Sequence, residues 1–169
     1  MNGTKVEGEE EVRSVVVSHF ASHFKAHYVD RSGVDNLNFR TLSHVEGVNL
    51  IKPFSEDEVK AAIWNCDGYK SHGLNGIHFG FMKDLWTELK VDIMWFISEF
   101  HLNGWLSKGI NSTFIALIPK VDSPMRLNEF YPISLVGSVY KILAKVLANR
   151  LQMITGSVIS DCQSAFVMD

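Results

Sequence analysis

The spacing of apolar residues predicts an amphipathic helix near the start of the chain. Within residues 7–28, apolar side chains recur every four positions and would form one stripe on a helix. The stripe consists of Val12, Val16, Phe20, Phe24 and Tyr28. Residues 29–52 are polar and irregular, and their Asp, Ser, Gly and Asn residues favour turns. We therefore expect an N-terminal helix followed by a connector.

Two further helical regions are expected in the middle of the chain. Ser55 and Glu58 have the spacing of a capping box, in which each side chain accepts a hydrogen bond from the other residue's backbone N–H. A short helix should follow and end near Asn65. After a glycine-punctuated loop at 68–76, residues 79–103 again show a helical core face, with a break near residues 86–87 and an end at Asn103-Gly104.

After residue 112 the pattern becomes that of a β-hairpin. Residues 113–119 are a short, β-branched apolar run typical of a strand, and residues 132–136 could return beside it. Pro132 must then lie at the start or the edge of its strand, because it has no N–H to donate. Residues 138–154 predict a helix, with its inward side chains at Val139, Leu143, Leu147, Leu151 and Ile154. The expected fold class is mainly α with a small β-hairpin (α+β).

Composition fits one globular domain. The chain has 169 residues, of which 46% are hydrophobic and 21% charged. Cys66 and Cys162 form no Cys-x-x-Cys pair, which excludes a zinc ribbon and a disulfide scaffold and favours a reducing compartment. The sequence shows no secretory signal and no apolar run of membrane-spanning length. We expect an intracellular chain, neither secreted nor in a membrane.

Charge is distributed unevenly along the chain. Residues 104–155 contain six basic and two acidic side chains, a net charge of +4, so the remaining residues carry −7 to give −3 overall. Local positive potential is what binding to a phosphate backbone requires. The asymmetry is compatible with nucleic-acid contact, although a solvated basic face is the more common explanation.

Two groups of residues could carry chemistry. His19, His23 and His27 share one helix face at a spacing that can chelate a metal, but no further ligand of that helix completes a site, so no metal is predicted. Arg150 falls on the inward face of its helix, with Lys141 and Lys145 expected to face solvent. A guanidinium there must be paired or reach a polar cleft, which leaves a structural ion pair, the favoured interpretation, or a contact with a ligand or nucleic acid.

Several segments together closely resemble the reverse transcriptases of plant non-LTR (LINE-type) retrotransposons. The segments, which cover roughly residues 50–169, are Pro53-Phe-Ser-Glu-Asp-Glu-Val59, Trp64-Asn-Cys-Asp-Gly-Tyr-Lys-Ser71, Phe114-Ile-Ala-Leu-Ile-Pro-Lys-Val-Asp122, Leu127-Asn-Glu-Phe-Tyr-Pro-Ile-Ser-Leu135, Tyr140-Lys-Ile-Leu-Ala-Lys-Val-Leu-Ala-Asn-Arg-Leu151 and Gln163-Ser-Ala-Phe166. Their combination in this order is specific, whereas any one of them alone is weak.

The resemblance implies a fold and an activity. It divides the chain into residues 1–52, an N-terminal helix and connector, and residues 53–169, a fingers-like part of a right-hand polymerase that is truncated before the palm. In the intact family enzyme, palm aspartates hold two Mg²⁺ ions for nucleotidyl transfer on an RNA template. The implied partner is an RNA or DNA template–primer in the nucleus or cytoplasm, with no membrane and no obligate protein partner.

The resemblance also assigns site residues. Lys120, in the Ile-Pro-Lys motif, corresponds to a cation for the incoming triphosphate, and Tyr131 stands where the family has an arginine, which should weaken nucleotide binding. The loop at 71–76 corresponds to a Ser-Pro-Gly-Pro-Asp-Gly turn near the template, with both prolines and the carboxylate lost. The implied nucleic-acid contacts are Lys70, Ser71, Gly73, Gly76 and Arg150.

Catalytic residues are not predicted. No nucleophile elbow, kinase signature or His-Glu-x-x-His is present, and neither is the [Phe/Tyr]-x-Asp-Asp motif of the family. We expect a truncated or decayed retroelement fragment that is inactive alone, holds no metal or cofactor, and retains at most residual nucleic-acid or nucleotide binding. The alternative is a non-catalytic helical protein-interaction domain. Missing palm contacts should leave apolar surface uncovered on the C-terminal helices.

Overall fold

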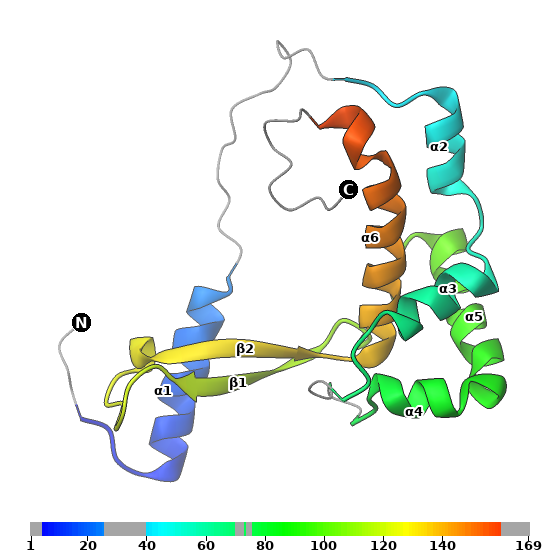
Figure 1. The fold of residues 1–169 in the computed structure, drawn as a ribbon. Helices are drawn as coiled ribbons and strands as arrows, with labels where there is room; N and C mark the ends of the chain where they lie inside the picture. The colour runs from blue at the N-terminus through cyan, green and yellow to red at the C-terminus, as the bar shows by residue number, and fades with distance from the viewer. Residues whose placement is uncertain (1–4, 26–39, 70–72, 74–75, 160–169) are drawn as a thin grey trace. The chain divides into compact units, whose positions relative to one another are not determined.

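The chain folds into helices and one small sheet (Figure 1). The computed structural model describes residues 5–25, 40–69, 73 and 76–159. Its elements are α1 (Glu9–His23), α2 (His44–Ile51), α3 (Glu56–Trp64), α4 (Phe79–Asp84), α5 (Trp86–Asn103), β1 (Thr113–Pro119), a 3₁₀ turn (Leu127–Glu129), β2 (Phe130–Val136) and α6 (Ser138–Val158). The expected α+β class is confirmed. None of the helices in the described ranges is long and apolar enough to cross a membrane.

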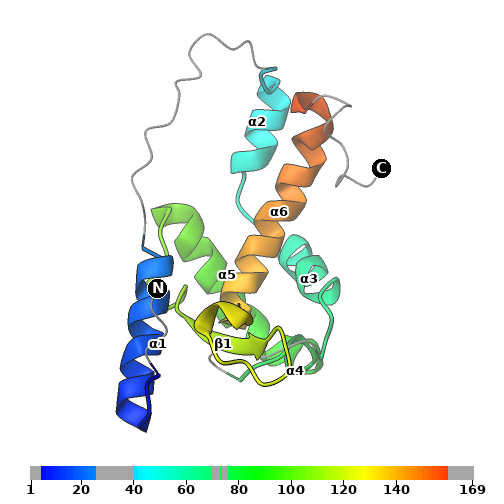
Figure 2. The ribbon, with the colours of Figure 1, turned by 90° about the vertical axis from the view of Figure 1, so that its left-hand side faces the viewer.

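The chain divides into two compact units. One contains Met1–Leu37 and Leu117–Pro132, and the other contains Asn38–Ala116 and Ile133–Asp169. The second unit holds the apolar core, in which α3 packs against α6, α4 and α5. Figures 1 and 2 show α6 beside α2 and α3. The core consists of Val59, Ala62, Ile63, Phe79, Met82, Trp86, Ile93, Ile97, Ile142, Leu143 and Val146. Burial of each large side chain contributes roughly 1.5–3 kcal/mol.

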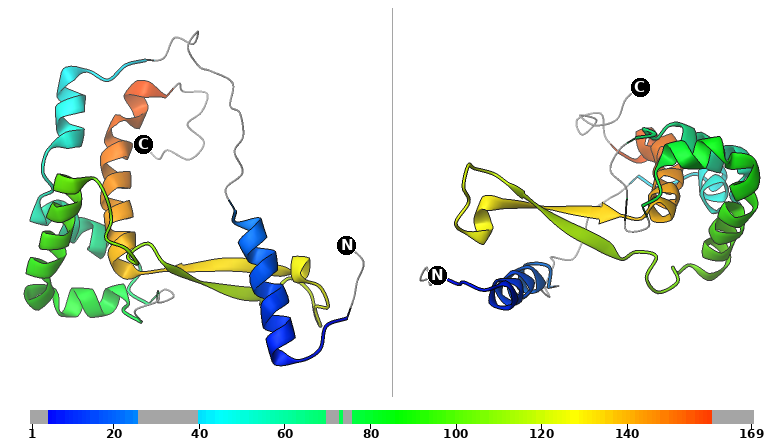
Figure 3. Two further views of the ribbon diagram at one scale, coloured as in Figure 1. Left: turned by 180° about the vertical axis from the view of Figure 1, so that it is seen from behind. Right: turned by 90° about the horizontal axis from the view of Figure 1, so that it is seen from below.

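The helix ends of the second unit follow local sequence signals. Ser55 Oγ accepts the N–H of Glu58 at 3.2 Å, and Glu58 Oε2 accepts the N–H of Ser55 at 2.9 Å, so the expected capping box is confirmed. The break between α4 and α5 falls at Leu85, close to the expected position (Figure 3). Gly104 ends α5 in a left-handed conformation, with φ 71°, which glycine adopts without strain.

The expected connector contains a helix. Residues 44–51 form α2, so the prediction of irregular structure through residue 52 is wrong there. The helix starts with a second capping box, in which Ser43 Oγ accepts the N–H of Glu46 at 3.3 Å and Glu46 Oε2 accepts the N–H of Ser43 at 2.7 Å. The signal was present at Ser43 and Glu46, but the eight residues that follow include Gly47 and are too short to show a clear stripe.

Helix α1 is shorter than expected and ends at His23. Of its predicted stripe, Phe20 is buried and Val16 is half-buried, whereas Val12 and Phe24 are exposed. Tyr28 lies outside the described residues. The spacing correctly placed these side chains on one face, but a stripe is buried only where another surface covers it.

The hairpin and α6 largely agree with the pattern. Strand β1 has the expected bounds, and β2 starts two residues before Pro132. Each strand of a two-stranded sheet has one free edge, where a proline without an N–H is tolerated. The buried face of α6 is rotated from the expected one, because Ile142 and Val146 are buried while Leu151 is 55% exposed. The expectation for Leu151 is therefore wrong.

Candidate nucleic-acid interface

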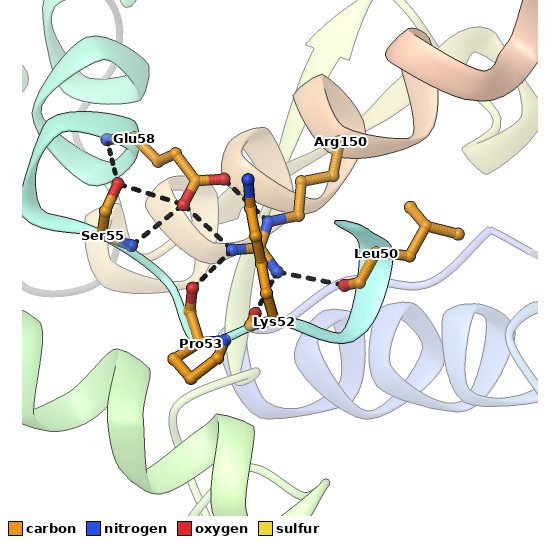
Figure 4. Close-up of polar contacts among 6 residues, drawn as sticks. All are labelled: Leu50, Lys52, Pro53, Ser55, Glu58 and Arg150. Carbon is orange, nitrogen blue, oxygen red and sulfur yellow. Dashed lines mark hydrogen bonds and ion pairs between the residues drawn. The ribbon is translucent and has the colours of Figure 1, made fainter. Parts of the chain in front are cut away.

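Arg150 is the most deeply buried charged residue in the described part of the chain, at 2% exposure. Its guanidinium forms a bidentate pair with Glu58, as Figure 4 shows. Nε donates to Glu58 Oε1 at 2.8 Å and Nη2 donates to Oε2 at 2.9 Å. Such a planar fork fits a carboxylate in a way that lysine does not.

The remaining donors of Arg150 bind the end of α2 and the segment between α2 and α3. Nη1 donates to the carbonyl oxygens of Leu50 at 3.0 Å and Lys52 at 2.5 Å, and Nη2 donates to that of Pro53 at 2.9 Å (Figure 4). The guanidinium carbon also lies 4.0 Å from the centre of the Phe54 ring. All five N–H groups are thus occupied within the chain. These contacts support the structural ion pair and leave no donor for a phosphate, so we do not include Arg150 in a nucleic-acid interface.

The pair changes the chemistry of Glu58. The hydrogen bonds from Arg150 are the largest cause that lowers the pKa of Glu58, from 4.5 to about 2, and they outweigh the burial that raises it. Hydrogen bonds from Ser55 lower the pKa further. Glu58 is therefore ionised at neutral pH and serves both to cap α3 and to hold α6.

Gly73, in the glycine loop, lies directly against the start of α6. A Cβ on Gly73 would lie 2.2 Å from the carbonyl oxygen of Val136 and 2.5 Å from Cα of Gly137, so only glycine fits there. Gly76 has φ +67° and donates its N–H to the carbonyl of Gly73 at 3.0 Å. These contacts agree with the permissive backbone expected of both glycines. Their nucleic-acid contacts stay predictions, and Lys70 and Ser71 lie outside the described residues.

Replacing Gly73 with alanine is expected to lower the free energy of unfolding by about 1–3 kcal/mol, because the new Cβ meets backbone atoms that cannot rotate away. Urea unfolding followed by circular dichroism would measure the change. Gly156→Ala is the matched control: its Cβ would meet nothing within 4 Å inside α6 and should stabilise the chain by about 0.5–1 kcal/mol. Equal effects of the two substitutions would contradict the close approach at Gly73.

Three lysines from two helices gather around the end of α3. Burial raises the pKa of the Cys66 thiol, and the positive charges of Lys145, Lys83 and Lys141 oppose that rise. Lys83 belongs to α4, and Lys141 and Lys145 belong to α6; both helices pack against α3. Lys83 Nζ also donates to the carbonyl oxygens of Trp64 at 3.1 Å and Cys66 at 2.7 Å. We refer to Lys83, Lys141 and Lys145 as the lysine cluster.

The lysine cluster was only partly foreseen. Lys141 and Lys145 were expected to face solvent, but both are half-buried on α6, the helix that packs against α3. Lys83 was missed altogether. Its position follows from the unpaired carbonyls at the end of α3, which need donors, but no spacing rule links those carbonyls to a lysine 17 to 19 residues away.

The tip of the hairpin holds Lys120 beside Tyr131. Lys120 Nζ lies 4.7 Å from the centre of the Tyr131 ring and donates to the carbonyl oxygen of Asn128 at 2.9 Å. Backbone hydrogen bonds from Met125 and then Arg126 lower the pKa of Glu129, which holds the turn. The two positions that the resemblance assigned to nucleotide binding are therefore neighbours, and Lys120 is exposed. Nucleotide binding by them stays a prediction.

The histidine strip of α1 is described only in part. The rings of His19 and His23 are stacked with their centroids 6.5 Å apart, and His27 lies outside the described residues. Within the part of the chain that the structure describes, no group of three His, Cys, Asp or Glu residues could hold a metal ion.

Comparison with known proteins gives one informative similarity. No protein-family model matches the chain. The chain is similar to the "Transposon TX1 uncharacterized 149 kDa protein" of Xenopus laevis, with 26% identity over 165 residues. The match covers 96% of this chain but only 13% of that protein, so the chain spans a small part of its relative. The similarity supports an origin of the chain in a transposable element.

Proposed function

We propose that the chain is a fingers fragment of an RNA-directed DNA polymerase, the reverse transcriptase of a LINE-type non-LTR retrotransposon. The similarity to a transposon protein along almost the whole chain is the observation that carries this proposal. The Ile-Pro-Lys and Pro-Ile-Ser-Leu motifs also support it. Ile118 and Pro119 end β1 and Lys120 follows directly, while the second motif lies on the paired strand β2. The plant family remains part of the proposal.

The activity proposed for the chain itself is binding to single-stranded or primed RNA or DNA, in the nucleus or cytoplasm. The lysine cluster is the proposed contact surface, because phosphate backbones are bound mainly by clustered cations. Lys141 and Lys145 are its proposed contacts, and Lys83 adds positive charge while its ammonium donates to two carbonyls. Gly73 lies at the start of α6, the helix that carries Lys141 and Lys145. Lys120 at the hairpin tip is proposed as a separate cation for a triphosphate.

Binding through the lysine cluster should depend steeply on salt. Fluorescence anisotropy with a labelled 20-nucleotide RNA is expected to give a linear decrease of log affinity with log salt concentration. In the Lys141→Gln/Lys145→Gln variant the slope should become shallower by roughly 1.4, since each lost phosphate contact to a single strand accounts for about 0.7.

The matched control is Lys5→Gln/Lys25→Gln, which removes the same charge from exposed positions in the N-terminal part of the chain. This variant should keep the wild-type slope. An equal loss in both variants would show that only net charge matters, and no binding at low salt would overturn the proposed activity.

Polymerisation by these residues alone is not expected. The 169-residue sequence contains no Asp-Asp pair, whereas two-metal nucleotidyl transfer needs carboxylates to hold Mg²⁺. In a primer-extension assay with Mg²⁺, an RNA template and all four deoxynucleotides, the purified chain should give no product above a heat-denatured sample. Magnesium-dependent cDNA synthesis would refute this prediction.

A further inference from the structure

Helix α5 has two apolar faces, and within the part of the chain that the structure describes only one of them is covered. Ile93 and Ile97 are buried in the core of the second unit. Another face carries large apolar side chains that are two-thirds to three-quarters exposed. They are Val91 at 68%, Trp95 at 66%, Leu102 at 76% and, just beyond the helix end, Trp105 at 74%. We refer to these four residues as the α5 stripe.

The α5 stripe is continuous along the helix. Residues 91, 95 and 102 are separated by four and seven positions, so they lie above one another at helical spacing. In both views of Figure 3, α5 lies at the outer edge of its unit. Single exposed apolar residues are common on protein surfaces, but a row with two exposed tryptophans is typical of interaction sites, where tryptophan is enriched among the residues that dominate binding.

Acidic side chains line one side of the α5 stripe. At 100° per residue, Glu88, Asp92 and Glu99 lie on the flank next to Trp95. All three are exposed, and no lysine or arginine in the described part of the chain forms an ion pair with any of them. Glu99 only accepts a hydrogen bond from Asn103 Nδ2, at 3.1 Å. The face thus combines an apolar row with an uncompensated negative edge.

We infer that the α5 stripe is a docking surface for an amphipathic helix of a partner protein, with an apolar face and lysine or arginine along one flank. The stripe offers anchors at the spacing by which helices pack together. The acidic edge favours a partner helix with a basic flank, and it determines which way that helix runs along α5. A second copy of this chain fits less well, because two α5 helices packed antiparallel about a twofold axis would bring both acidic edges to the same side.

The test uses the full 169-residue chain and two synthetic 18-residue peptides. Both peptides carry leucine at the same helical positions, one with lysine and the other with glutamate at the remaining positions. Fluorescence anisotropy should show that the wild-type chain binds the lysine peptide at least tenfold more tightly than the glutamate peptide. The variant Glu88→Lys/Asp92→Lys/Glu99→Lys retains the α5 stripe and should reverse this preference.

A second variant separates apolar docking from charge attraction alone. Trp95→Asp/Leu102→Asp should weaken binding of the lysine peptide at least tenfold at 0.3 M salt, although it makes the surface more acidic. Val15→Asp/Val17→Asp adds the same charge at exposed positions on α1 and should not weaken binding. Circular dichroism checks that each variant is folded. If Trp95→Asp/Leu102→Asp is unfolded, the peptide preference of the charge-reversal variant alone decides the test.

Three results would overturn the inference. They are equal affinity of the wild-type chain for both peptides, unchanged peptide preference after charge reversal, and a concentration-dependent dimer in light scattering that disappears in Trp95→Asp/Leu102→Asp. The last result would identify the occupant as a second copy of this chain. None of these measurements involves nucleic acid, so the inference stands or fails independently of the proposed function.

Discussion

Replacing Arg150 with methionine is expected to lower the free energy of unfolding by about 3–5 kcal/mol, the usual cost of breaking a buried ion pair by removing one partner. Methionine keeps much of the length of the side chain but donates no hydrogen bond. The substitution would leave the Glu58 carboxylate and the carbonyls of Leu50, Lys52 and Pro53 without their donor. Urea unfolding followed by circular dichroism would measure the loss.

Two further variants make the test specific. Arg150→Lys keeps the positive charge, but its three donors sit on one nitrogen and cannot reach both Glu58 oxygens and three carbonyls. Its free energy of unfolding should therefore lie between those of the wild type and Arg150→Met. Lys90→Met breaks the exposed pair with Glu56, at 3.2 Å, and should cost less than about 1 kcal/mol. If Arg150→Met costs no more than Lys90→Met, Arg150 does not anchor the fold.

The contacts of Arg150 explain why the segment between α2 and α3 holds its position. Lys52 and Pro53 belong to no helix or strand that could pair their carbonyls, and Leu50 lies in the last turn of α2, where carbonyls have no donor within the helix. Helix α6 supplies the donors from Arg150, 97 to 100 positions further along the chain. Arg150 therefore has the structural role that its place on an apolar helix face favoured, and not the nucleic-acid contact that was the alternative. The candidate interface depends instead on lysines that this scaffold brings together.

Local signals in the sequence predicted the helix and strand ends well. The Ser55–Glu58 capping box, the glycine at 104 and the β-branched run of β1 each act within a few residues, so their physical effect is contained in the sequence itself. The same type of signal at Ser43 and Glu46 was overlooked because α2 is short. A capping box therefore predicts a helix even where the stripe that follows is weak.

Features that depend on distant residues were harder to predict. The burial of Arg150 followed from its place on the helix, but its partner Glu58 lies 92 residues earlier in the chain. The buried face of α6 includes Ile142 and Val146, which the apolar stripe did not predict. The position of α3 against α6, and not the stripe alone, determines which side of the helix is covered. The place of Lys83 in the lysine cluster likewise depends on how α4 folds back to α3.

Acid is expected to weaken the fold between about pH 5 and pH 2 through Glu58. Its pKa is about 2 in the folded chain, against 4.5 ordinarily, so at neutral pH the ionised form stabilises the fold by roughly 3 kcal/mol. As the pH falls below about 5, the unfolded chain takes up a proton that the folded chain does not, and this stabilisation decreases. It is lost once the pH falls below the folded-state pKa.

Urea unfolding at a series of pH values from 7 to 2 would measure this effect, and the Arg150→Met variant would assign it. Without the guanidinium, the largest cause of the lowered pKa is gone, so the stability of the variant should change less over the same pH range. The difference in the free energy of unfolding between wild type and variant should therefore shrink as the pH falls.

Glu56→Gln, which removes an exposed carboxylate paired with Lys90, should leave the wild-type pH profile almost unchanged. A constant difference between wild type and Arg150→Met from pH 7 to pH 2 would mean that the contribution of Arg150 comes from its hydrogen bonds to the carbonyls, not from the charge on Glu58.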